Sequence, residues 1–357
     1  MKLRPSLDWL LICVPGAIFL DFLAPERHTL IFLVACVAVI PLAGWLGKAT
    51  EHLAERTTDG IGGLLNATFG NAAELIIALF ALRRGLTEVV KASITGSIIG
   101  NILLVLGAAF VVGGVRHKDQ DFNVAGARVQ ATMLTLAAVA LIMPAVFHHL
   151  VGASTAERTL SLEISVVLIV TYGLMLLFSL HTHKQLFTGT AAQAAQVVDE
   201  GRPPWSLRRS LGVLVGAAAM IGWVSEVLVG SVEAAAESLG MTEVFVGVIV
   251  VAVVGNAAEH SSAILMAWKN RMDLAVGIAV GSSIQIALFV APVLVFTSLF
   301  LGPEPIDLVF TPAEVIAVGL AVLITGQIAG DGRSNWLEGV QLLVVYAILG
   351  SVFFFLP

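Results

Sequence analysis

Residues 65–85 read LNATFGNAAELIIALFALRRG, and residues 250–264 read VVAVVGNAAEHSSAI. The pentapeptide GNAAE is therefore present twice, each time inside a long apolar segment. A carboxylate near the middle of a membrane costs about 2.5–3.5 kcal/mol on insertion scales. A chain that carries this cost twice, in the same short motif, is expected to use both groups.

A second pair of motifs follows the first at a matching distance. ITGSIIGN covers residues 94–101, and GSSIQIALFVAP covers residues 281–292. The GNAAE copies begin at 70 and 255, a separation of 185 residues, and the two Gly-Ser pairs, which begin at 96 and 281, have the same separation. Duplicated, interrupted apolar segments with polar residues near the midplane are typical of secondary transporters. The spacing therefore predicts two related halves.

The composition places this protein in the membrane. Of its 357 residues, 58% are hydrophobic and 12% are charged, and the mean hydropathy is +0.95. Soluble domains have about 25% charged residues. We therefore predict an all-α polytopic membrane protein, and the hydropathy excludes a nucleic-acid-binding role. No Ser/His/Asp or metal-hydrolase spacing is present, so we expect neither an enzyme nor a bound cofactor.

The apolar segments are long enough to cross a bilayer, because a helical span needs roughly 20 apolar residues. Eleven transmembrane helices are predicted, at residues 7–23, 29–48, 60–82, 88–113, 127–147, 158–180, 207–230, 242–268, 273–301, 312–329 and 336–356. The most polar internal stretch contains Pro203-Pro204, which stops a helix. We expect an N-terminal transmembrane helix in residues 1–27, a first five-helix repeat in 28–180, a cytoplasmic linker in 181–206 and a second five-helix repeat in 207–357.

The basic residues predict how the chain is oriented. With the N-terminus inside, the cytoplasmic loops collect 14 Lys and Arg residues and the opposite loops collect 5. The cytoplasmic set is Lys2, Arg4, Lys48, Arg56, Arg116, Lys118, Arg128, Lys184, Arg202, Arg208, Arg209, Lys269, Arg271 and Arg333. The opposite set is Arg27, Arg83, Arg84, Lys91 and Arg158. The positive-inside rule therefore favours a cytoplasmic N-terminus and a C-terminus on the outer side.

The two motif copies enter the membrane from opposite sides in this topology. The first lies in the third span and the second in the eighth, and a shift of five spans reverses the direction of the chain. The repeat is therefore inverted, and the first span falls outside it. Small residues shared by the halves are common in any packed membrane helix, but shared Asn and Glu at one spacing are not.

The polar side chains in the motifs are candidate cation ligands. Asn and Glu three residues apart share one face of a helix in each GNAAE copy. Hard cations such as Ca²⁺ take 6–8 oxygen ligands from carboxylates, amides, carbonyls and water. Gly70 and Gly255 would loosen the helix locally and expose backbone carbonyls. The candidate metal ligands are Asn71, Glu74, Ser97, Asn256, Glu259, Ser282 and Gln285.

The charges of the two glutamates limit which ions the site can hold. Two carboxylates buried together repel each other, and neither tolerates ionisation alone in a low dielectric. One divalent cation neutralises both, and so do two protons. A site that is filled by one or the other is the core of an exchanger.

Purely structural roles are the alternative for each of these residues. Glu74 and Glu259 would then be interhelical hydrogen-bonding groups, and Ser97 and Ser282 would pack against neighbouring backbones. For Asn101, packing or helix–helix hydrogen bonding is favoured over ligation, because its counterpart in the second half is Ile286. Gln285, whose counterpart is Gly100, shares a helical face with Ser282 and stays a ligand candidate.

The four motifs together resemble the signature repeats of calcium/proton exchangers, a family of the calcium/cation antiporter superfamily. The resemblance is strongest in residues 50–115 and 240–300. It implies a fold of one helix plus two inverted five-helix repeats. It also implies exchange of Ca²⁺ for H⁺ across the bilayer by alternating access, with Glu74 and Glu259 as the shared site. The seven candidate ligands fall on the family's cation-coordinating pattern.

Two departures from the family pattern bear on location and regulation. Many relatives carry a longer acidic stretch between the halves, whereas here only Asp199-Glu200 remain. The N-terminal tail is short, so a prokaryotic plasma (inner) membrane is expected in preference to a vacuole. A homo-oligomer is compatible with the sequence.

Two further functions compete with Ca²⁺/H⁺ exchange. One is exchange of Na⁺ or another cation for H⁺ or Ca²⁺. The other is a cation channel that uses the same carboxylates as a selectivity ring. An inverted pair argues against the channel, because channels more often place like residues around a pore axis.

Overall fold

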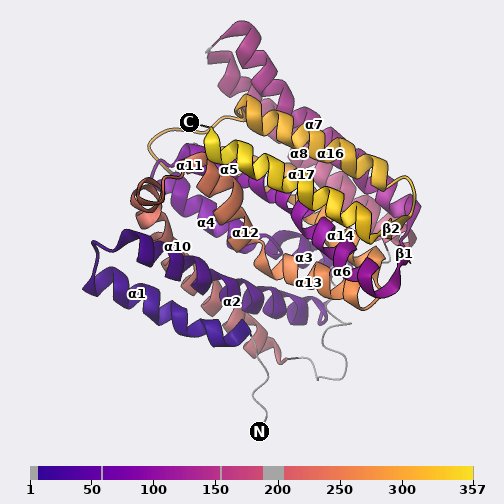
Figure 1. Ribbon diagram of the computed structural model, residues 1–357, viewed down its shortest axis with the longest axis horizontal. Coiled ribbons are helices and arrows are strands. Elements are labelled where there is room, and N and C mark those ends of the chain that lie inside the picture. The colour runs from indigo at the N-terminus through magenta and orange to yellow at the C-terminus, as the bar shows by residue number, and fades with distance from the viewer. Residues whose placement is uncertain (1–6, 58, 153–154, 188–204, 357) are drawn as a thin grey trace.

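The structure, a computed structural model, is a bundle of helices that runs through residues 7–57, 59–152, 155–187 and 205–356, the part of the chain described here (Figure 1). Its α-helices are α1 (Cys13–Leu23), α2 (His28–Ala54), α3 (Asp59–Phe69), α4 (Ala72–Arg83), α5 (Thr87–Ile99), α6 (Leu106–His117), α7 (Val124–Val151), α8 (Thr155–Leu177), α10 (Leu207–Leu239), α11 (Glu243–Phe245), α12 (Ala252–Gly255), α13 (Ala257–Trp268), α14 (Met272–Gln285), α15 (Ala291–Ser298), α16 (Pro312–Ile328) and α17 (Trp336–Phe355). Two short strands, β1 (Asp119–Asp121) and β2 (Arg333–Asn335), pair antiparallel.

Most of these helices are long and apolar enough to cross a bilayer. Within the described residues, seven continuous helices pass this test, and two bent helix pairs bring the number to nine. α16 is apolar but has only 17 residues. The first predicted span, 7–23, divides into a 3-10 segment at Leu7–Ile12 and the 11-residue α1. The fold is thus an all-α membrane protein, whereas the number of eleven spans stays a prediction.

Two predicted spans are broken in the middle, each at a GNAAE motif. α3 and α4 meet at Gly70 and Asn71 with a bend of 42°, and α12 and α13 meet at Asn256 with a bend of 61°. Asn71 and Asn256 have φ/ψ values of −101°/24° and −87°/11°, in the bridge region between helix and turn. Glycine before the break lowers the local helix propensity, and the asparagine interrupts the helical ladder.

The span that follows each broken span is continuous and contains a π segment. Gly100–Val105 joins α5 to α6, and Ile286–Val290 joins α14 to α15. The two π segments begin within a turn of Ser97 and Ser282, at nearly the same place in the repeat. Two more π segments are Phe178–Thr182, which ends α8, and Val246–Val251, which precedes α12 and has no equivalent in α3. Such π turns leave backbone groups outside the regular ladder and are frequent at functional sites.

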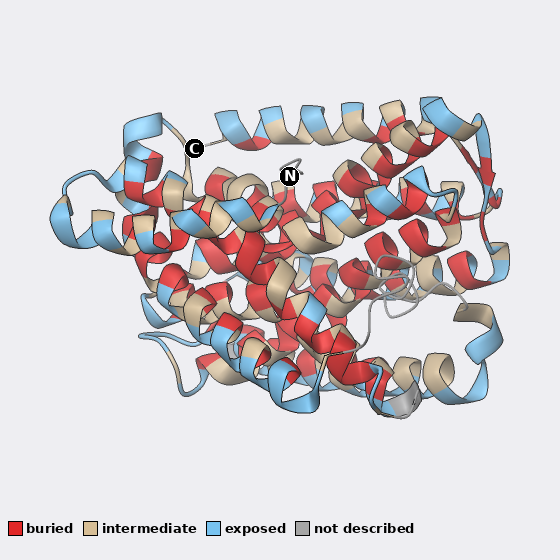
Figure 2. Cartoon of the chain, turned by 90° about the horizontal axis from the view of Figure 1, so that it is seen from below, coloured by how far each residue is buried: buried red, intermediate tan, exposed pale blue. Residues whose placement is uncertain are grey.

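The helices that carry the motifs form the centre of the molecule. Figure 2 shows the buried residues concentrated in the interior of the bundle, with exposed faces on its outer surface. The spans Thr87–His117 and Met272–Ser298 are buried over most of their length, whereas Val124–Val151, Ala156–Thr182 and Trp336–Phe355 are buried over less than a third. A membrane protein can expose apolar side chains because lipid surrounds it, and the exposed apolar residues on these outer helices fit that surrounding.

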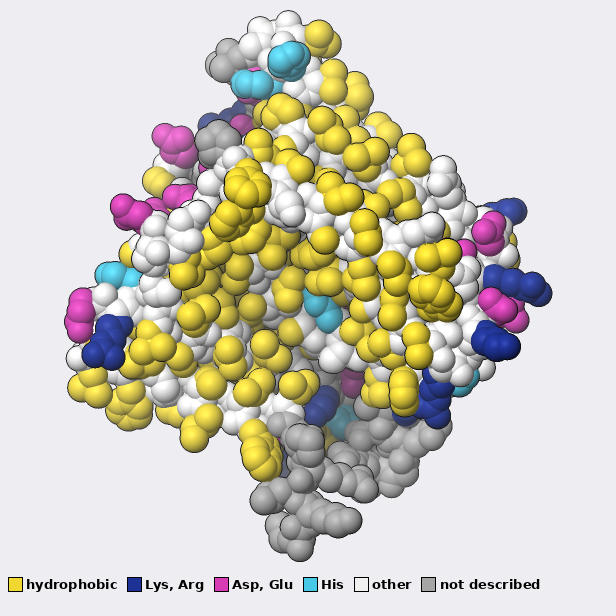
Figure 3. Space-filling view, in the orientation of Figure 1, with side chains coloured by type: hydrophobic (Ala, Val, Ile, Leu, Met, Phe, Trp, Pro, Cys, Tyr) yellow, Lys and Arg dark blue, Asp and Glu magenta, His cyan; other side chains and the backbone are white. Residues whose placement is uncertain are grey.

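Charged side chains gather mainly at two opposite margins of the apolar face (Figure 3). At one margin the loops before α7, α14 and α17 are tied together. Gln120 Nε2 donates to Asn270 Oδ1 at 2.8 Å, Arg333 Nε donates to Asp121 Oδ1 at 3.1 Å, and the two strands pair there. We call this margin the β1–β2 end. The predicted linker begins at the same end with a 3-10 turn at Lys184–Phe187, and its residues 188–204 lie outside the described part of the chain.

Candidate functional site

The two breaks bring the polar residues of both motifs into one hydrogen-bonded network. Asn71 Nδ2 donates to Gln285 Oε1 at 2.5 Å, and Ser282 Oγ donates to Asn71 Oδ1 at 3.0 Å. In the other half, Asn256 Nδ2 donates to Ser97 Oγ at 2.9 Å. Asn71 therefore contacts α14 of the second half, and Asn256 contacts α5 of the first half. Each asparagine forms hydrogen bonds across the two halves.

Asn101 joins these two groups. Its Nδ2 lies 3.0 Å from Ser282 Oγ and 3.2 Å from Asn256 Oδ1, and the residue is fully buried in the π segment after α5. Its Oδ1 has no hydrogen-bond partner among the described residues. Asn101 thus makes the helix–helix hydrogen bonds that the sequence favoured for it. Its position as the link between the halves was not foreseen, because Ile286 gives it no polar counterpart.

Glu74, the glutamate of the first motif, lies beside this network. The Glu74 side chain packs on the second break, so that a Cβ at Gly255 would lie 3.0 Å from Glu74 Cγ. Both Glu74 carboxylate oxygens are buried and have no hydrogen-bond partner within the described residues. A buried carboxylate without partners is costly unless a proton or a cation neutralises it.

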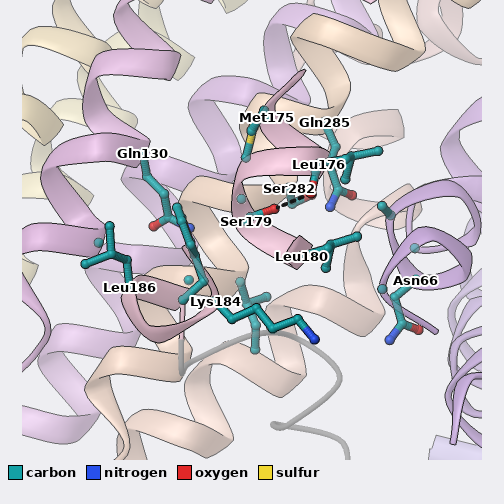
Figure 4. Close-up of a pocket in the computed structure, with 18 of the residues that line it drawn as sticks. Asn66, Gln130, Met175, Leu176, Ser179, Leu180, Lys184, Leu186, Ser282 and Gln285 are labelled. Carbon is teal, nitrogen blue, oxygen red and sulfur yellow. Dashed lines mark hydrogen bonds between the residues drawn. The ribbon is translucent and has the colours of Figure 1, made fainter. Parts of the chain in front are cut away.

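A cavity of about 550 Å³ leads to the site from the β1–β2 end. Its mouth includes Thr57, Asn123, Lys184 and Asp273, which lie where helices begin or end at that margin. Figure 4 shows Ser282 and Gln285 on one wall, Gln130 and Leu186 on another, and the Lys184 side chain extending below them toward the side where Asn66 lies. The cavity therefore leads from one end of the bundle to the first break, and both polar and apolar side chains line it.

The charges on the cavity wall are mostly negative. The described lining residues include the acids Glu51, Glu55, Glu259 and Asp273 and one base, Lys184. Low-dielectric walls with one sign of charge raise the local concentration of counter-ions. This wall would attract cations.

The seven predicted ligands do not all face this cavity. Asn71, Glu259, Ser282 and Gln285 line it, whereas Glu74, Ser97 and Asn256 do not. All seven nevertheless lie in the same region, because hydrogen bonds and the contact at Gly255 connect the two groups. The described residues hold no cluster of three or more His, Cys, Asp or Glu side chains arranged for a metal. The site is instead rich in amide and hydroxyl oxygens around two carboxylates, a donor set that suits a hard cation.

The two halves differ in how closely their helices cross at the Gly-Ser pairs. A Cβ placed on Gly96 would overlap the backbone of Val248, so α5 lies directly against the π segment before α12. With the repeat offset of 185, the equivalent pair is Gly281 and Gly63. Both line the cavity, and the nearest neighbour of a Cβ at Gly281 would be Gln130 Nε2, 3.9 Å away. The crossing is therefore closed in one half and open in the other.

Sequence reasoning missed several residues at the site. Tyr172, Gln130, Asn66 and Glu51 line the cavity, and the hydroxyl of Tyr172 donates to the carbonyl of Ala67 at 3.1 Å. Asn66 could have been noticed, because it lies in the first quoted motif. Tyr172 and Gln130 come from α8 and α7, which carry neither motif, so no repeat pointed to them.

Comparison with known proteins shows the family to which this chain belongs. The profile described as sodium/calcium exchanger protein matches residues 27–181 and 209–355, which together are most of the chain. A Ca(2+)/H(+) antiporter, ChaA, of Bacillus subtilis (strain 168) is 49% identical over 350 residues, covering 97% of this chain and 98% of that protein. A Ca(2+)/H(+) antiporter of Aphanothece halophytica is 48% identical over 339 residues, covering 92% and 90%.

Solved structures agree with this assignment. The structure described as native YfkE superimposes with a TM-score of 0.84 at 43% sequence identity, covering 98% of this chain and 100% of that chain. The sequence identities, the coverage of both chains and the shared fold confirm the family that the motifs resembled. This chain belongs to the calcium/proton exchanger family of the calcium/cation antiporter superfamily.

Proposed function

We propose that this protein is a secondary active transporter that exchanges Ca²⁺ for H⁺ across a membrane by alternating access. Glu74 and Glu259 form the shared site, which holds either one Ca²⁺ or two protons. Asn71, Ser97, Asn256, Ser282 and Gln285 supply further oxygen atoms as the ion moves between them. The relatives named as Ca²⁺/H⁺ antiporters support this choice of ions.

One observation carries the proposal. Two helices broken at the same motif place two carboxylates beside a single buried network of amides and hydroxyls, at the end of a cation-attracting cavity. The Glu74 oxygens have no hydrogen-bond donor among the described residues. A proton or a cation is then needed to keep the carboxyl group in a low dielectric. Competition between Ca²⁺ and H⁺ for the same carboxylates gives obligatory exchange.

The difference between the two crossings supports alternating access. The crossing of Gly96 with Val248 is closed, while Gly281 and Gly63 stand on the wall of the open cavity. If the halves exchange conformations, the second crossing closes and the first opens, and the site then faces the other end of the bundle. Inverted repeats commonly permit such an exchange around a fixed site.

The membrane arrangement is part of the same proposal. We propose eleven spans, with α1 outside two five-helix units at 28–180 and 207–357, joined by the linker at 181–206. The two segments matched by the family profile support this division. With a cytoplasmic N-terminus, the β1–β2 end and the cavity face the cytoplasm of a prokaryotic cell. The basic side chains at that end support this orientation.

The direct test is transport by the purified protein in proteoliposomes. We expect ⁴⁵Ca²⁺ uptake when a pH gradient drives protons out of the vesicles, and no uptake when an ionophore collapses the gradient. Uptake that persists without any proton gradient would indicate a channel. Uptake that depends on a Na⁺ gradient and not on the pH gradient would indicate a different exchanger.

Neutral variants test the two-carboxylate site. Glu74→Gln and Glu259→Gln are each expected to abolish exchange and leave the protein folded, because each keeps the shape but removes the charge that Ca²⁺ must balance. Glu226→Gln is the matched control, since Glu226 is an exposed acid on α10 that pairs with Arg84 at 2.6 Å. Exchange at the wild-type rate in either motif variant would refute the shared site.

A further inference from the structure

Asn71 and Asn256 are equivalent in the repeat, but they form different hydrogen bonds with their own helices. In the second half, the carbonyl of Ala252 accepts both the backbone N–H of Asn256 at 3.2 Å and its side-chain Nδ2 at 2.9 Å. Asn256 therefore caps the end of its own broken helix. The equivalent residues in the first half, by the offset of 185, are Ala67 and Asn71.

Tyr172 takes over this capping bond in the first half. Its hydroxyl donates to the carbonyl of Ala67 at 3.1 Å. The Asn71 side-chain amide is directed away from its own helix and donates to Gln285 Oε1 at 2.5 Å. Because a buried carbonyl needs a donor, the tyrosine hydroxyl removes the need for Asn71 to turn back as Asn256 does.

The residue that accepts the hydrogen bond from the Asn71 amide also has no equivalent for Asn256. Gln285 has Gly100 as its counterpart, so no glutamine is available to Asn256. Gln285 and Tyr172 thus act on opposite sides of Asn71: one accepts its amide, and the other satisfies the carbonyl that would compete for it. With the amide so placed, Asn71 Oδ1 accepts from Ser282 at 3.0 Å on the cavity side.

The tyrosine ring is itself fixed by packing. Tyr172 is 5% exposed and stacks on Phe289, with ring centroids 5.4 Å apart and an interplanar angle of 25°. Phe289 belongs to the π segment that follows Gln285 in the same long helix. α8 thereby contacts both the first break and the helix that Asn71 reaches, although it carries neither motif.

We infer that Tyr172 is a positioning residue for the transported cation: its hydroxyl caps Ala67 and so keeps Asn71 directed at Gln285 and Ser282. This inference rests on the proposed function, since the cation in question is Ca²⁺. Without the hydroxyl, the Asn71 amide is expected to turn back to Ala67, in the manner of Asn256. The site would then lose one preoriented amide oxygen but keep both glutamates.

The sharpest test is Tyr172→Phe in the proteoliposome assay, because phenylalanine keeps the ring and its stacking. We expect the KM for Ca²⁺ to rise roughly 3- to 10-fold, the effect of one hydrogen bond, with kcat within about twofold of the wild type. The matched control is Tyr346→Phe. Tyr346 on α17 is the only other tyrosine, and its hydroxyl has no partner among the described residues. It should leave both constants unchanged.

A double-mutant cycle separates positioning from general packing. If both residues act through Asn71, Tyr172→Phe and Gln285→Ala should be non-additive, and the double variant should have nearly the KM of Gln285→Ala alone. Effects that multiply would overturn the inference. So would a fall in kcat with unchanged KM, because that would make the hydroxyl part of the packing or of the conformational change.

A second measurement does not depend on activity. In the Tyr346→Phe protein grown with 3-fluorotyrosine, the single fluorine-labelled ring is that of residue 172. Its ¹⁹F resonance should shift when Ca²⁺ is added, and a resonance unchanged at saturating Ca²⁺ would overturn the inference. If the wild type takes up no Ca²⁺ at all, the proposed function fails. If the wild type transports and Tyr172→Phe matches it, only the role of Tyr172 fails.

Discussion

Gly281 offers a way to block one conformation of this exchanger without disturbing the other. A Cβ at this position would have its nearest neighbour 3.9 Å away, so Gly281→Ala fits the structure as it stands. In the opposite conformation, the repeat requires Gly281 to approach Gly63 as Gly96 now approaches Val248. A Cβ on Gly96 would overlap the Val248 backbone. The added methyl group would therefore penalise only the conformation with the closed cavity.

The size of the penalty follows from the cost of overpacking. An extra methyl group in a well-packed contact destabilises that packing by about 1–3 kcal/mol. This shifts the equilibrium between two conformations by roughly 5- to 150-fold. Exchange requires both conformations, so the transport rate of Gly281→Ala should fall steeply, within that range. Ca²⁺ binding from the open cavity should be retained.

Gly96→Ala should act in the opposite direction. Its methyl group meets Val248 in the present conformation, so it should favour the state in which the cavity is closed. Gly173→Ala is the matched control, because a Cβ placed on Gly173 of α8 would meet no neighbouring heavy atom within 4 Å, and the residue does not belong to either crossing. It should transport like the wild type.

Cysteine accessibility measures the shift directly. Ser179 lines the cavity on the segment that ends α8. Ser179→Cys, in a background without Cys13 and Cys36, should react faster with a polar maleimide in Gly281→Ala and more slowly in Gly96→Ala. Wild-type transport and unchanged labelling in Gly281→Ala would refute the reasoning, since the α14 and α3 helices would then not approach each other.

Two further predictions concern protonation and topology. Apparent Ca²⁺ affinity, measured by calorimetry between acid and neutral pH, should fall as pH drops, because protons and Ca²⁺ compete for Glu74 and Glu259 as one coupled pair; an affinity independent of pH would mean that protons take a separate path. Single cysteines at the exposed positions Arg83 and Lys269, in the same cysteine-free background, should be labelled by an impermeant reagent from opposite sides of the membrane; labelling of both from one side would contradict the inverted repeat.

The position of each break could be predicted from the sequence. Gly and Asn weaken a helix locally, and this effect depends on neighbours in the chain, so GNAAE marked both bends. The spacing of 185 residues also predicted that the two halves correspond and that their oxygen-bearing side chains converge. The hydrophobic composition predicted the membrane helices, and the motifs predicted the family. All of these features are encoded locally or by repetition.

Which equivalent residues face the cavity was decided only by the tertiary structure. Ser282 lines the cavity while Ser97 does not, although their motifs match. The reason is that one crossing is closed and the other open, a difference in packing between segments far apart in the chain. Tyr172 contacts Ala67 across 105 positions, and Asn101 contacts Ser282 across 181. A repeat in the sequence is symmetric, whereas a transporter in any one conformation is not.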